Sequence, residues 1–506
     1  MVKTRPSRRR PLILRLLTAP VHAHPKSAKG VVSMFKHFSK LDSWALVLFL
    51  LIVIGGPILI LFSISHSFLP FIHHFGFVIF LIVISSSTWV LLLTMYYVFM
   101  MLFGWGKARR DYPLVAPKSR FLIFIPAHNE AAVITATLKH LQQLNYPKAA
   151  YHIVVVSDQS TDQTTTLAAA QGVQVIDTSR QRYQRVGVGK PAGLQYALDE
   201  LTDSGTLEQY DLVMVLDADN FTDPNLLREL DSQYQAKHFT AIQAYLDSKN
   251  DNTLLTLGYA MSYWTMNRFF QLSKYRLGLD NSIGGTGFVV ERQWLEANHG
   301  FHSHSLTEDL EMEIRIVESG GTVGWNHFAR IYDEKPDHLR ASMTQRFRWS
   351  RGHWYTAFHN LVPLLHHFLK TGDLRDLDQL SYLFSMRQNF QYLLASFFGI
   401  AWVISLVMPS LGLHPIWLID VDRSYFVPIT LINWLILLEG FIPMIAGFLY
   451  DANWEGSKWL ITPKAVLAFF WFSLTYLIVQ IGGLLTFPNQ KAWAHTQHVL
   501  TVTHHL

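Results

Sequence analysis

The longest uncharged stretch of the chain sets the strongest limit on its fold. From Ser43 to Gly106 there is no Asp, Glu, Lys or Arg. About 20 apolar residues form a helix that crosses the hydrocarbon layer of a bilayer, so this stretch has room for two crossings. We place them at 44–65 and 76–103, and the sequence therefore predicts a membrane protein rather than one compact soluble domain.

Three more apolar segments follow the polar middle of the chain. We expect crossings at 389–410, 426–450 and 464–487, in which Glu439 is the only acidic residue. A transporter or receptor would carry charged side chains along a path through its membrane helices. The scarcity of such charges argues against both and places the function in the polar middle region.

The N-terminal arm predicts on which side of the membrane this polar region lies. Before Asp42 the chain has ten Lys and Arg residues and no acidic residue. By the positive-inside rule the arm stays in the cytoplasm, and two crossings return the chain there. A secretory signal peptide is the alternative, but it would have a shorter apolar core and a cleavage site. The net charge of +5 owes much to this arm, which can contact anionic lipid headgroups and requires no nucleic-acid ligand.

The polar region 107–388 alternates between strand and helix patterns. Apolar runs predict strands at 120–126, 152–156, 172–177 and 211–216, with helices at 164–171 and 190–201. Such alternation predicts a mostly parallel α/β sheet with helices on both faces. Ligands bind these sheets beyond the carboxyl ends of the strands, where Asp158, Asp217 and Asp219 fall.

The triplet Asp217-Ala218-Asp219 is a candidate metal site. Two carboxylates at this spacing can converge on a hard cation such as Mg²⁺ or Mn²⁺ beside a diphosphate. The chain has no cysteine, so any metal must be held by oxygen or imidazole ligands. A solvated turn is the alternative reading, but the position after a buried strand favours a metal.

Three further polar residues follow strand ends or begin a helix. Asp158 is either a ligand contact or a helix cap, and Asp162 is expected to be a simple cap. Lys190 precedes Pro191 at a predicted helix start, where amides and an ammonium can meet a phosphate. The Gly-Lys-Pro sequence alone is weak evidence for a phosphate site, and only the other motifs of the chain strengthen this interpretation.

An acidic cluster, Thr307-Glu308-Asp309, precedes a helix that we expect at 310–319. Thr307 suits the helix cap, and the two acids suit the first turn. A group transfer onto a hydroxyl needs a base within hydrogen-bond reach, and a carboxylate at a helix start can serve as that base. We therefore expect Asp309 to be the base, and a capping role for Thr307 is compatible with this.

A basic aromatic cluster lies at 345–349, Gln-Arg-Phe-Arg-Trp. Guanidinium groups pair with phosphate, and an indole can stack on a sugar ring. A surface basic stripe is the alternative, but Trp349 lies between Arg348 and Arg351, just before an apolar aromatic segment at 354–369 that can lie along the bilayer surface. The 24 histidines have no spacing that requires a metal site.

Together, five motifs resemble the processive, membrane-bound branch of glycosyltransferase family 2, which includes synthases of cellulose, hyaluronan and poly-N-acetylglucosamine. In chain order they are Pro126–Glu130, Asp158, Asp217–Asp219, Thr307–Asp309 and Gln345–Trp349. The resemblance implies a GT-A-type α/β glycosyltransferase domain inserted between transmembrane α-helices, with about five crossings and interfacial helices.

The resemblance also divides the chain. The expected parts are a basic cytoplasmic arm at 1–43, two transmembrane helices at 44–106, the glycosyltransferase domain at 107–352, interfacial helices at 353–388, about three transmembrane helices at 389–490 and a tail at 491–506. Neither a counterpart of the gating-loop motif of cellulose synthases nor a cyclic-dinucleotide-binding domain is recognisable. Both departures weaken a strict cellulose synthase reading.

The roles implied by the resemblance cover a donor, a metal and an acceptor. The expected contacts to a UDP-sugar are Glu130, Asp158, Lys190, Asp217, Gln345 and Arg348. Asp217 and Asp219 would bind Mg²⁺ or Mn²⁺, and Glu308 and Trp349 would contact the acceptor. Asp309 would then act as the base in an inverting displacement that gives a β-linkage.

Two acceptors remain open. In the first hypothesis the enzyme extends a polysaccharide and extrudes it through its own membrane helices. In the second it moves one sugar to a lipid. Trp349 with its two neighbouring arginines favours the first hypothesis, while the identity of the sugar, the linkage and any accessory subunits stay undetermined by the sequence.

Overall fold

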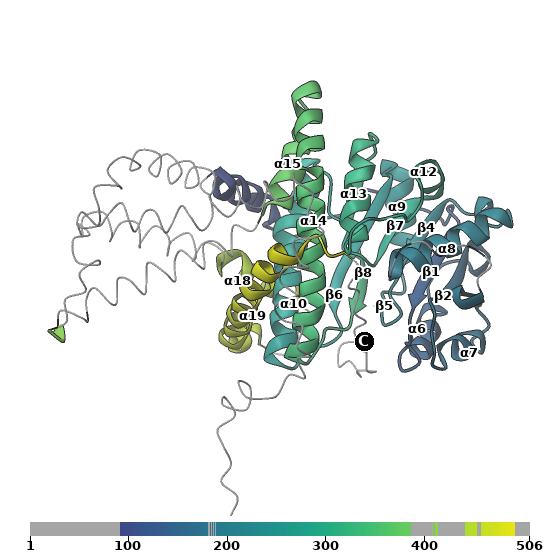
Figure 1. Cartoon of the computed structure of the whole chain (residues 1–506), viewed down its shortest axis with the longest axis horizontal. Helices are drawn as coiled ribbons and strands as arrows, with labels where there is room; N and C mark the ends of the chain where they lie inside the picture. The colour runs from purple at the N-terminus through teal and green to yellow at the C-terminus, as the bar shows by residue number, and fades with distance from the viewer. Residues whose placement is uncertain are drawn as a thin grey trace, which may run out of the picture.

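A computed structural model of the 506-residue chain describes most of its polar middle region and part of its C-terminal third. The described residues are 92–180, 183, 185, 187, 189–385, 407, 410–412, 441–452 and 457–490. Within them, an eight-stranded sheet lies between two groups of helices, and a further group of long helices stands beside β6 and β8 (Figure 1).

The strands are β1 Phe121–Ala127, β2 Tyr151–Ser157, β3 Gln174–Asp177, β4 Leu212–Val215, β5 Phe221–Thr222, β6 Ala241–Ser248, β7 Phe288–Glu291 and β8 Val323–Asp333. The α-helices are α6 Ile134–Leu141, α7 Thr164–Ala169, α8 Lys190–Asp203, α9 Leu226–Lys237, α10 Leu254–Met266, α11 Ser273–Leu277, α12 Arg292–Ala297, α13 Glu308–Glu318, α14 Leu339–Thr371, α15 Leu374–Leu383, α18 Phe441–Asp451 and α19 Lys458–Thr486. A π-helical segment, Asn267–Leu272, joins α10 to α11.

Alternation along the central strands determines which helices cover which face of the sheet. In β1, Phe121 and Ile123 point toward α6 and α9, whereas Leu122 and Phe124 point toward α8 and α13. Successive side chains of a strand point to opposite faces, so a strand covered on both sides is apolar throughout. The sequence prediction of an α/β sheet with helices on both faces is confirmed.

The strand order is β3-β2-β1-β4-β7-β6-β8-β5. The first four strands are mutually parallel, and β6 is parallel to β8, whereas β7 is antiparallel to β4 and β6 and β5 is antiparallel to β8. Two antiparallel steps across β7 bring β6 and β8 into the same direction as β4. The carboxyl ends of β1, β2, β4 and β8 therefore meet at one edge of the sheet.

The helices α10, α14, α18 and α19 stand side by side beyond β6 and β8 (Figure 1). Small residues of α19, including Ala465 and Ala468, are fully buried among them. At Gly258 of α10 an added Cβ would lie 2.8 Å from the Ala468 carbonyl oxygen. The two helices thus approach each other as closely as their backbones allow.

Among the described residues, one helix is long and apolar enough to cross a bilayer. It is the Leu460–Thr486 part of α19, with a mean hydropathy of 1.8, and it coincides with the crossing expected at 464–487. Two shorter apolar helices, Leu92–Gly104 and Phe441–Asp451, coincide with the ends of the crossings expected at 76–103 and 426–450. The remaining crossings, at 44–65 and 389–410, lie outside the described residues apart from two positions of the second, so they stay predictions.

Candidate active site

One cavity of about 580 Å³ opens at the carboxyl edge of the sheet, next to α10, α14 and α19. Every site residue predicted from the sequence lines it: Glu130, Asp158, Lys190, Asp217, Asp219, Glu308, Asp309, Gln345, Arg348 and Trp349. These residues come from strand ends, two helix starts and the middle of α14. The structure therefore brings together positions that are up to 219 residues apart, from Glu130 to Trp349.

Asp158, directly after β2, is held by a side chain that the sequence did not single out. The Arg185 guanidinium donates to both of its carboxylate oxygens, at 2.8 and 2.7 Å, and the Thr178 hydroxyl donates to Oδ1 at 2.8 Å. Asp158 does not cap a helix, whereas Asp162 accepts the amide of Thr164, the first residue of α7, at 2.9 Å. Asp162 therefore satisfies one amide of the first turn of α7, but the N-cap residue is Gln163, which makes no capping hydrogen bond.

Lys190 begins α8, as the sequence predicted, and points across the edge of the sheet. Its Nζ lies 2.5 Å from Asp217 Oδ1 and donates to the Gly285 carbonyl oxygen at 2.6 Å. Burial disfavours the ammonium, but the carboxylates of Asp217 and Glu308 outweigh this effect and raise the pKa of Lys190. Lys190 therefore stays charged beside the strand-end carboxylates, where a phosphate would also be attracted.

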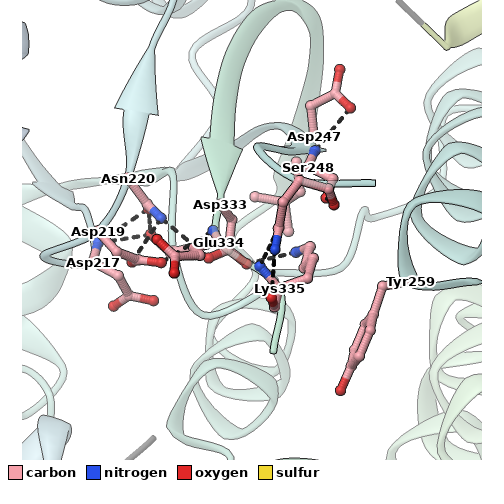
Figure 2. Close-up of polar contacts among 12 residues, drawn as sticks. Asp217, Asp219, Asn220, Asp247, Ser248, Tyr259, Asp333, Glu334 and Lys335 are labelled. Atoms are coloured by element: carbon pink, nitrogen blue, oxygen red, sulfur yellow. Dashed lines mark hydrogen bonds and ion pairs between the residues drawn. The ribbon is translucent and has the colours of Figure 1, made fainter. Parts of the chain in front are cut away.

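Asp219 lies deeper than Asp217, with 1% of its surface exposed. Its Oδ2 accepts the Glu334 amide at 3.1 Å, and its Oδ1 accepts the Asn220 side-chain amide at 3.2 Å. Figure 2 shows Asp219 and Asn220 next to Asp333 and Glu334 at the end of β8. This contact exists because β8 runs in the same direction as β4.

The residues present suit a divalent cation. Asp217 and Asp219 offer carboxylate oxygens to the same cavity, and hard cations prefer such ligands. No group of three His, Cys, Asp or Glu residues that could hold a metal by itself occurs among the described residues. A cation here would therefore take its other ligands from the oxygens of a bound diphosphate and from water.

Asp309 lies in the first turn of α13, beside Glu308. Burial and the neighbouring Glu308 carboxylate raise the pKa of Asp309 from 3.8 to about 7, against the opposing effects of the Leu310 amide, Lys190 and Arg348. A carboxylate with a pKa near the working pH can both accept a proton and exist in the ionised form. The pKa and the position of Asp309 in the cavity thus suit a general base.

Thr307 occupies the N-cap position of α13, but its hydroxyl makes no capping hydrogen bond, so that prediction is wrong. The reason is the close approach of α14. A Cβ at Gly352 would lie 2.7 Å from the Thr307 amide nitrogen, and the Thr307 hydroxyl lies 3.5 Å from that of Thr356. The side chain of Thr307 thus belongs to the contact between α13 and α14.

The basic aromatic cluster 345–349 lies within α14, and helical geometry separates its members. Gln345, Arg348 and Trp349 line the cavity. Arg346 points the other way and is fully buried, with its guanidinium 4.5 Å from the ring centre of Phe472 in α19. The cluster therefore divides into a cavity face and a face that joins α14 to α19.

Arg348 is only partly buried. Its Nε is inaccessible to solvent and has no hydrogen-bond partner among the described residues. A buried donor without a partner is costly, and a bound anion would supply the missing acceptor. This observation supports the predicted contact between Arg348 and a phosphorylated donor.

Several cavity residues were missed by the sequence predictions. They are on α10 (Tyr259, Ser262, Tyr263 and Met266), on α19 (Phe469, Phe472, Ser473, Tyr476 and Gln480) and on α15 (Tyr382). Along α10 and along α19, the cavity-lining residues recur at intervals of three or four positions, which places them on one face of each helix. A polar stripe in an otherwise apolar helix was the available signal, because such a stripe marks a face turned away from lipid.

Comparison with known proteins agrees with the geometry. Residues 117–352 match the model of a family described as "Glycosyltransferase like family 2". This part of the chain is therefore similar to the glycosyltransferase domains of family 2. The expectation of a GT-A-like α/β fold is confirmed by the sheet together with this match, whereas the processive branch of the family is not shown.

Similar proteins include a "Probable glycosyltransferase YdaM" of Bacillus subtilis, 27% identical over 62% of this chain and 73% of that protein. A "Beta-monoglucosyldiacylglycerol synthase" of Synechocystis is 28% identical over 47% of this chain and 48% of its own length, so the match spans about half of that relative. Among solved structures, a mannosyltransferase of Pyrobaculum calidifontis in complex with GDP-Man and Mn²⁺ covers 79% of this chain and 96% of its own, with 14% identity and a TM-score of 0.44.

Proposed function

We propose that this chain is an inverting glycosyltransferase that moves a sugar from a UDP-sugar to the end of a growing β-linked polysaccharide, with Mg²⁺ or Mn²⁺ as cofactor. The observation that carries the proposal is the single cavity, in which the strand-end carboxylates, Asp309 and Trp349 all lie. A metal binder, a base and an aromatic platform are the three elements that a sugar transfer needs together.

At the donor end, Lys190 and Arg348 supply positive charge for the diphosphate, and Glu130 and Asp158 contact the nucleotide. Asp217 and Asp219 would hold the cation, which would neutralise charge on the leaving diphosphate when bound. Because Arg185 occupies both oxygens of Asp158, a donor that contacts this carboxylate must share it with Arg185 or displace it.

At the acceptor end, the incoming hydroxyl loses its proton to Asp309 as the bond to the anomeric carbon forms. Glu308 lies beside this base, and Trp349 offers its indole to the terminal sugar. Direct displacement by a hydroxyl on the face opposite the diphosphate inverts the anomeric centre, so an α-linked donor gives a β-linked product.

The proposed location is the membrane, with the catalytic domain on the cytoplasmic side. Exposed apolar residues of α19 lie at spacings of three, four or seven: Leu460, Leu467, Trp471, Leu474, Ile478, Ile481 and Leu485. This spacing is one helix face, and the opposite face packs on α10 and α14. A continuous apolar face of this length suits lipid contact, and the polymer would leave along the cavity that α19 helps to line.

A second candidate function is the transfer of a single sugar to a lipid acceptor. The named relative from Synechocystis, a glycolipid synthase, favours it. Both candidates share the donor, metal and base roles and differ only in the acceptor.

The deciding experiment measures UDP release by the purified, detergent-solubilised protein. UDP-glucose, UDP-N-acetylglucosamine and UDP-glucuronate are supplied singly and in pairs, with and without Mg²⁺ or Mn²⁺, with Asp309→Asn as the inactive control. Metal-dependent turnover with a long, hydrolase-sensitive polymer would support the polysaccharide hypothesis. Turnover with only a lipid-extractable product would support the second candidate, and no turnover with any donor would contradict the proposed function.

A further inference from the structure

A buried carboxylate that the proposed reaction does not use lies directly behind the cavity. Glu313, one helical turn after Asp309 on α13, is 0% exposed. Its Oε2 accepts the Ile283 amide at 3.1 Å, and its Oε1 accepts the Ser282 hydroxyl at 3.4 Å. Both donors belong to the segment Ser282–Thr286, which we call the glycine loop.

The glycine loop forms part of the cavity wall and touches three residues of the proposed site. The Gly285 carbonyl oxygen accepts Lys190 Nζ at 2.6 Å, and the Thr286 hydroxyl accepts the Asp217 amide at 2.9 Å. At Gly285 φ is +79°, and an added Cβ would lie 3.1 Å from Asp309 Oδ2. A small shift of this loop would therefore move the base, the ammonium and the metal triplet relative to one another.

Glu313 has a buried counter-charge. Lys274 of α11 is also 0% exposed, and its attraction opposes the effect of burial, which raises the pKa of Glu313 to about 7. Lys274 Nζ lies 2.7 Å from Asp378 Oδ2 on α15, and Asp378 Oδ1 accepts the hydroxyl of Tyr96 at 2.5 Å. Buried charges are tolerated when they are paired, so Lys274 is needed to keep an ionised Glu313 behind the loop, whereas the negative charge of Asp378 acts in the opposite direction and raises the pKa of Glu313.

Neutral side chains also anchor the glycine loop. Gln271 accepts the Ser282 amide at 3.1 Å and donates to its carbonyl oxygen at 2.7 Å, and Gln243 accepts the Gly284 amide at 2.8 Å. The loop can therefore fold without Glu313. What the carboxylate adds is a charge-assisted hydrogen bond at Ile283, between these two anchors, which is stronger and more directional than a neutral one.

We propose that Glu313 is a positioning residue: its carboxylate holds the glycine loop, and through the loop Lys190 and Asp309, in the geometry for transfer, with Lys274 as its counter-charge. The inference rests on the proposed function of the cavity. It also connects the apolar helix Leu92–Gly104, through Tyr96 and Asp378, to the reaction centre.

The kinetic test is a double-mutant cycle with Glu313→Gln, Lys274→Met and both together, using Glu318→Gln at the end of α13 as the matched control. Glu313→Gln should lower kcat by about tenfold and change the donor KM by less than about twofold, because loss of one charge-assisted hydrogen bond disturbs alignment more than donor binding. Lys274→Met should act through Glu313, so the double variant should be no slower than the slower single variant. If the double variant lost kcat by the product of the two single losses, the proposed role of Lys274 would be contradicted. An unchanged kcat in Glu313→Gln would contradict the role of Glu313.

A second readout does not depend on turnover. Hydrogen exchange of the peptide that contains Ile283 should be faster in Glu313→Ala than in the wild type, and unchanged in Glu318→Ala. If this peptide exchanged in Glu313→Ala at the same rate as in the wild type, the positioning role would be overturned even if the protein is an active transferase. Faster exchange in a protein that turns over no donor would support the loop anchor and refute only the proposed function.

Discussion

The raised pKa of Asp309 leads to a quantitative prediction about the pH dependence of transfer. A shift from 3.8 to about 7 corresponds to about 4 kcal/mol of destabilisation of the ionised form. Only the ionised form can accept a proton, so the rate should rise with pH through this pKa. About one tenth of the carboxyl is ionised at pH 6 and about nine tenths at pH 8, so kcat/KM at fixed metal should rise about tenfold between them.

The rise of the rate with pH forms the acid limb of the pH profile. The charged groups around Asp309 determine how the pH of this limb should change when one of them is substituted. Glu308 is its nearest like charge and raises its pKa, whereas Lys190 and Arg348 lower it. Glu308→Gln removes one negative charge next to the base and stabilises the ionised Asp309. The acid limb should therefore move to lower pH by roughly one pKa unit.

The measurement is the position of the limb, since Glu308→Gln can also weaken acceptor contacts and lower the maximal rate. Initial rates of UDP release are recorded from pH 5 to pH 9 for the wild type, Glu308→Gln and Glu318→Gln. The last variant makes the same charge change at the other end of α13, and its limb should stay at the wild-type position. A limb at the same pH in the wild type and Glu308→Gln would refute the assignment of the limb to Asp309.

Three further predictions concern the metal, the acceptor and the two faces of α14. Asp219→Ala should abolish the Mn²⁺-dependent part of UDP binding, measured by calorimetry with and without the metal, and unchanged metal dependence would rule out its ligand role. Trp349→Ala should shorten the products on a sizing gel while Trp349→Phe keeps most of their length, because a smaller ring still stacks on a sugar. Arg346→Met should lower the free energy of unfolding by about 1–3 kcal/mol, seen as a lower Tm in detergent, because it removes a buried guanidinium from its aromatic and hydrogen-bond partners. Arg348→Met should instead leave Tm nearly unchanged and reduce kcat/KM, and the reverse pattern would contradict the separation of the two faces.

The sequence predicted strands β1 to β4, and β1, β2 and β4 were recognisable because they are buried on both faces of the sheet. The run 153–156 has no polar residue, and soon after such a strand the chain continues with a polar residue that has no place in the core. Strands β5 to β8 were not predicted. β5 Phe221–Thr222 and β7 Phe288–Glu291 are too short for periodicity to be recognised, and in β6 Ala241–Ser248 and β8 Val323–Asp333 polar residues interrupt the apolar ones. The antiparallel pairing of β7 depends on partners more than 40 residues away, which no local pattern encodes.

The site was predicted to the extent that its residues stand at strand ends or helix starts. Asp217 and Asp219 could be found in this way, since geometry at the edge of a parallel sheet follows from the fold class. Arg185 could not be found, because several arginines precede Lys190 and nothing local distinguishes the one that reaches Asp158. Glu313 was also hidden, because an acidic residue in an amphipathic helix normally faces solvent.

The division of α14 gives a physical reason why the apolar helix α19 and the proposed reaction centre should respond to each other. Gln345, Arg348 and Trp349 face the cavity, while Arg346 is fixed to α19 through Phe472 and donates to the Thr475 hydroxyl at 3.0 Å. A rotation of α14 that weakened the contact of Arg346 with α19 would also turn Trp349 away from the acceptor. The glycine loop is tied to α15 and to the helix Leu92–Gly104 in the same manner, through Lys274 and Asp378. Both sides of the cavity are thus anchored to apolar helices, so a displacement of α19 should disturb the position of Trp349 before it disturbs the sheet.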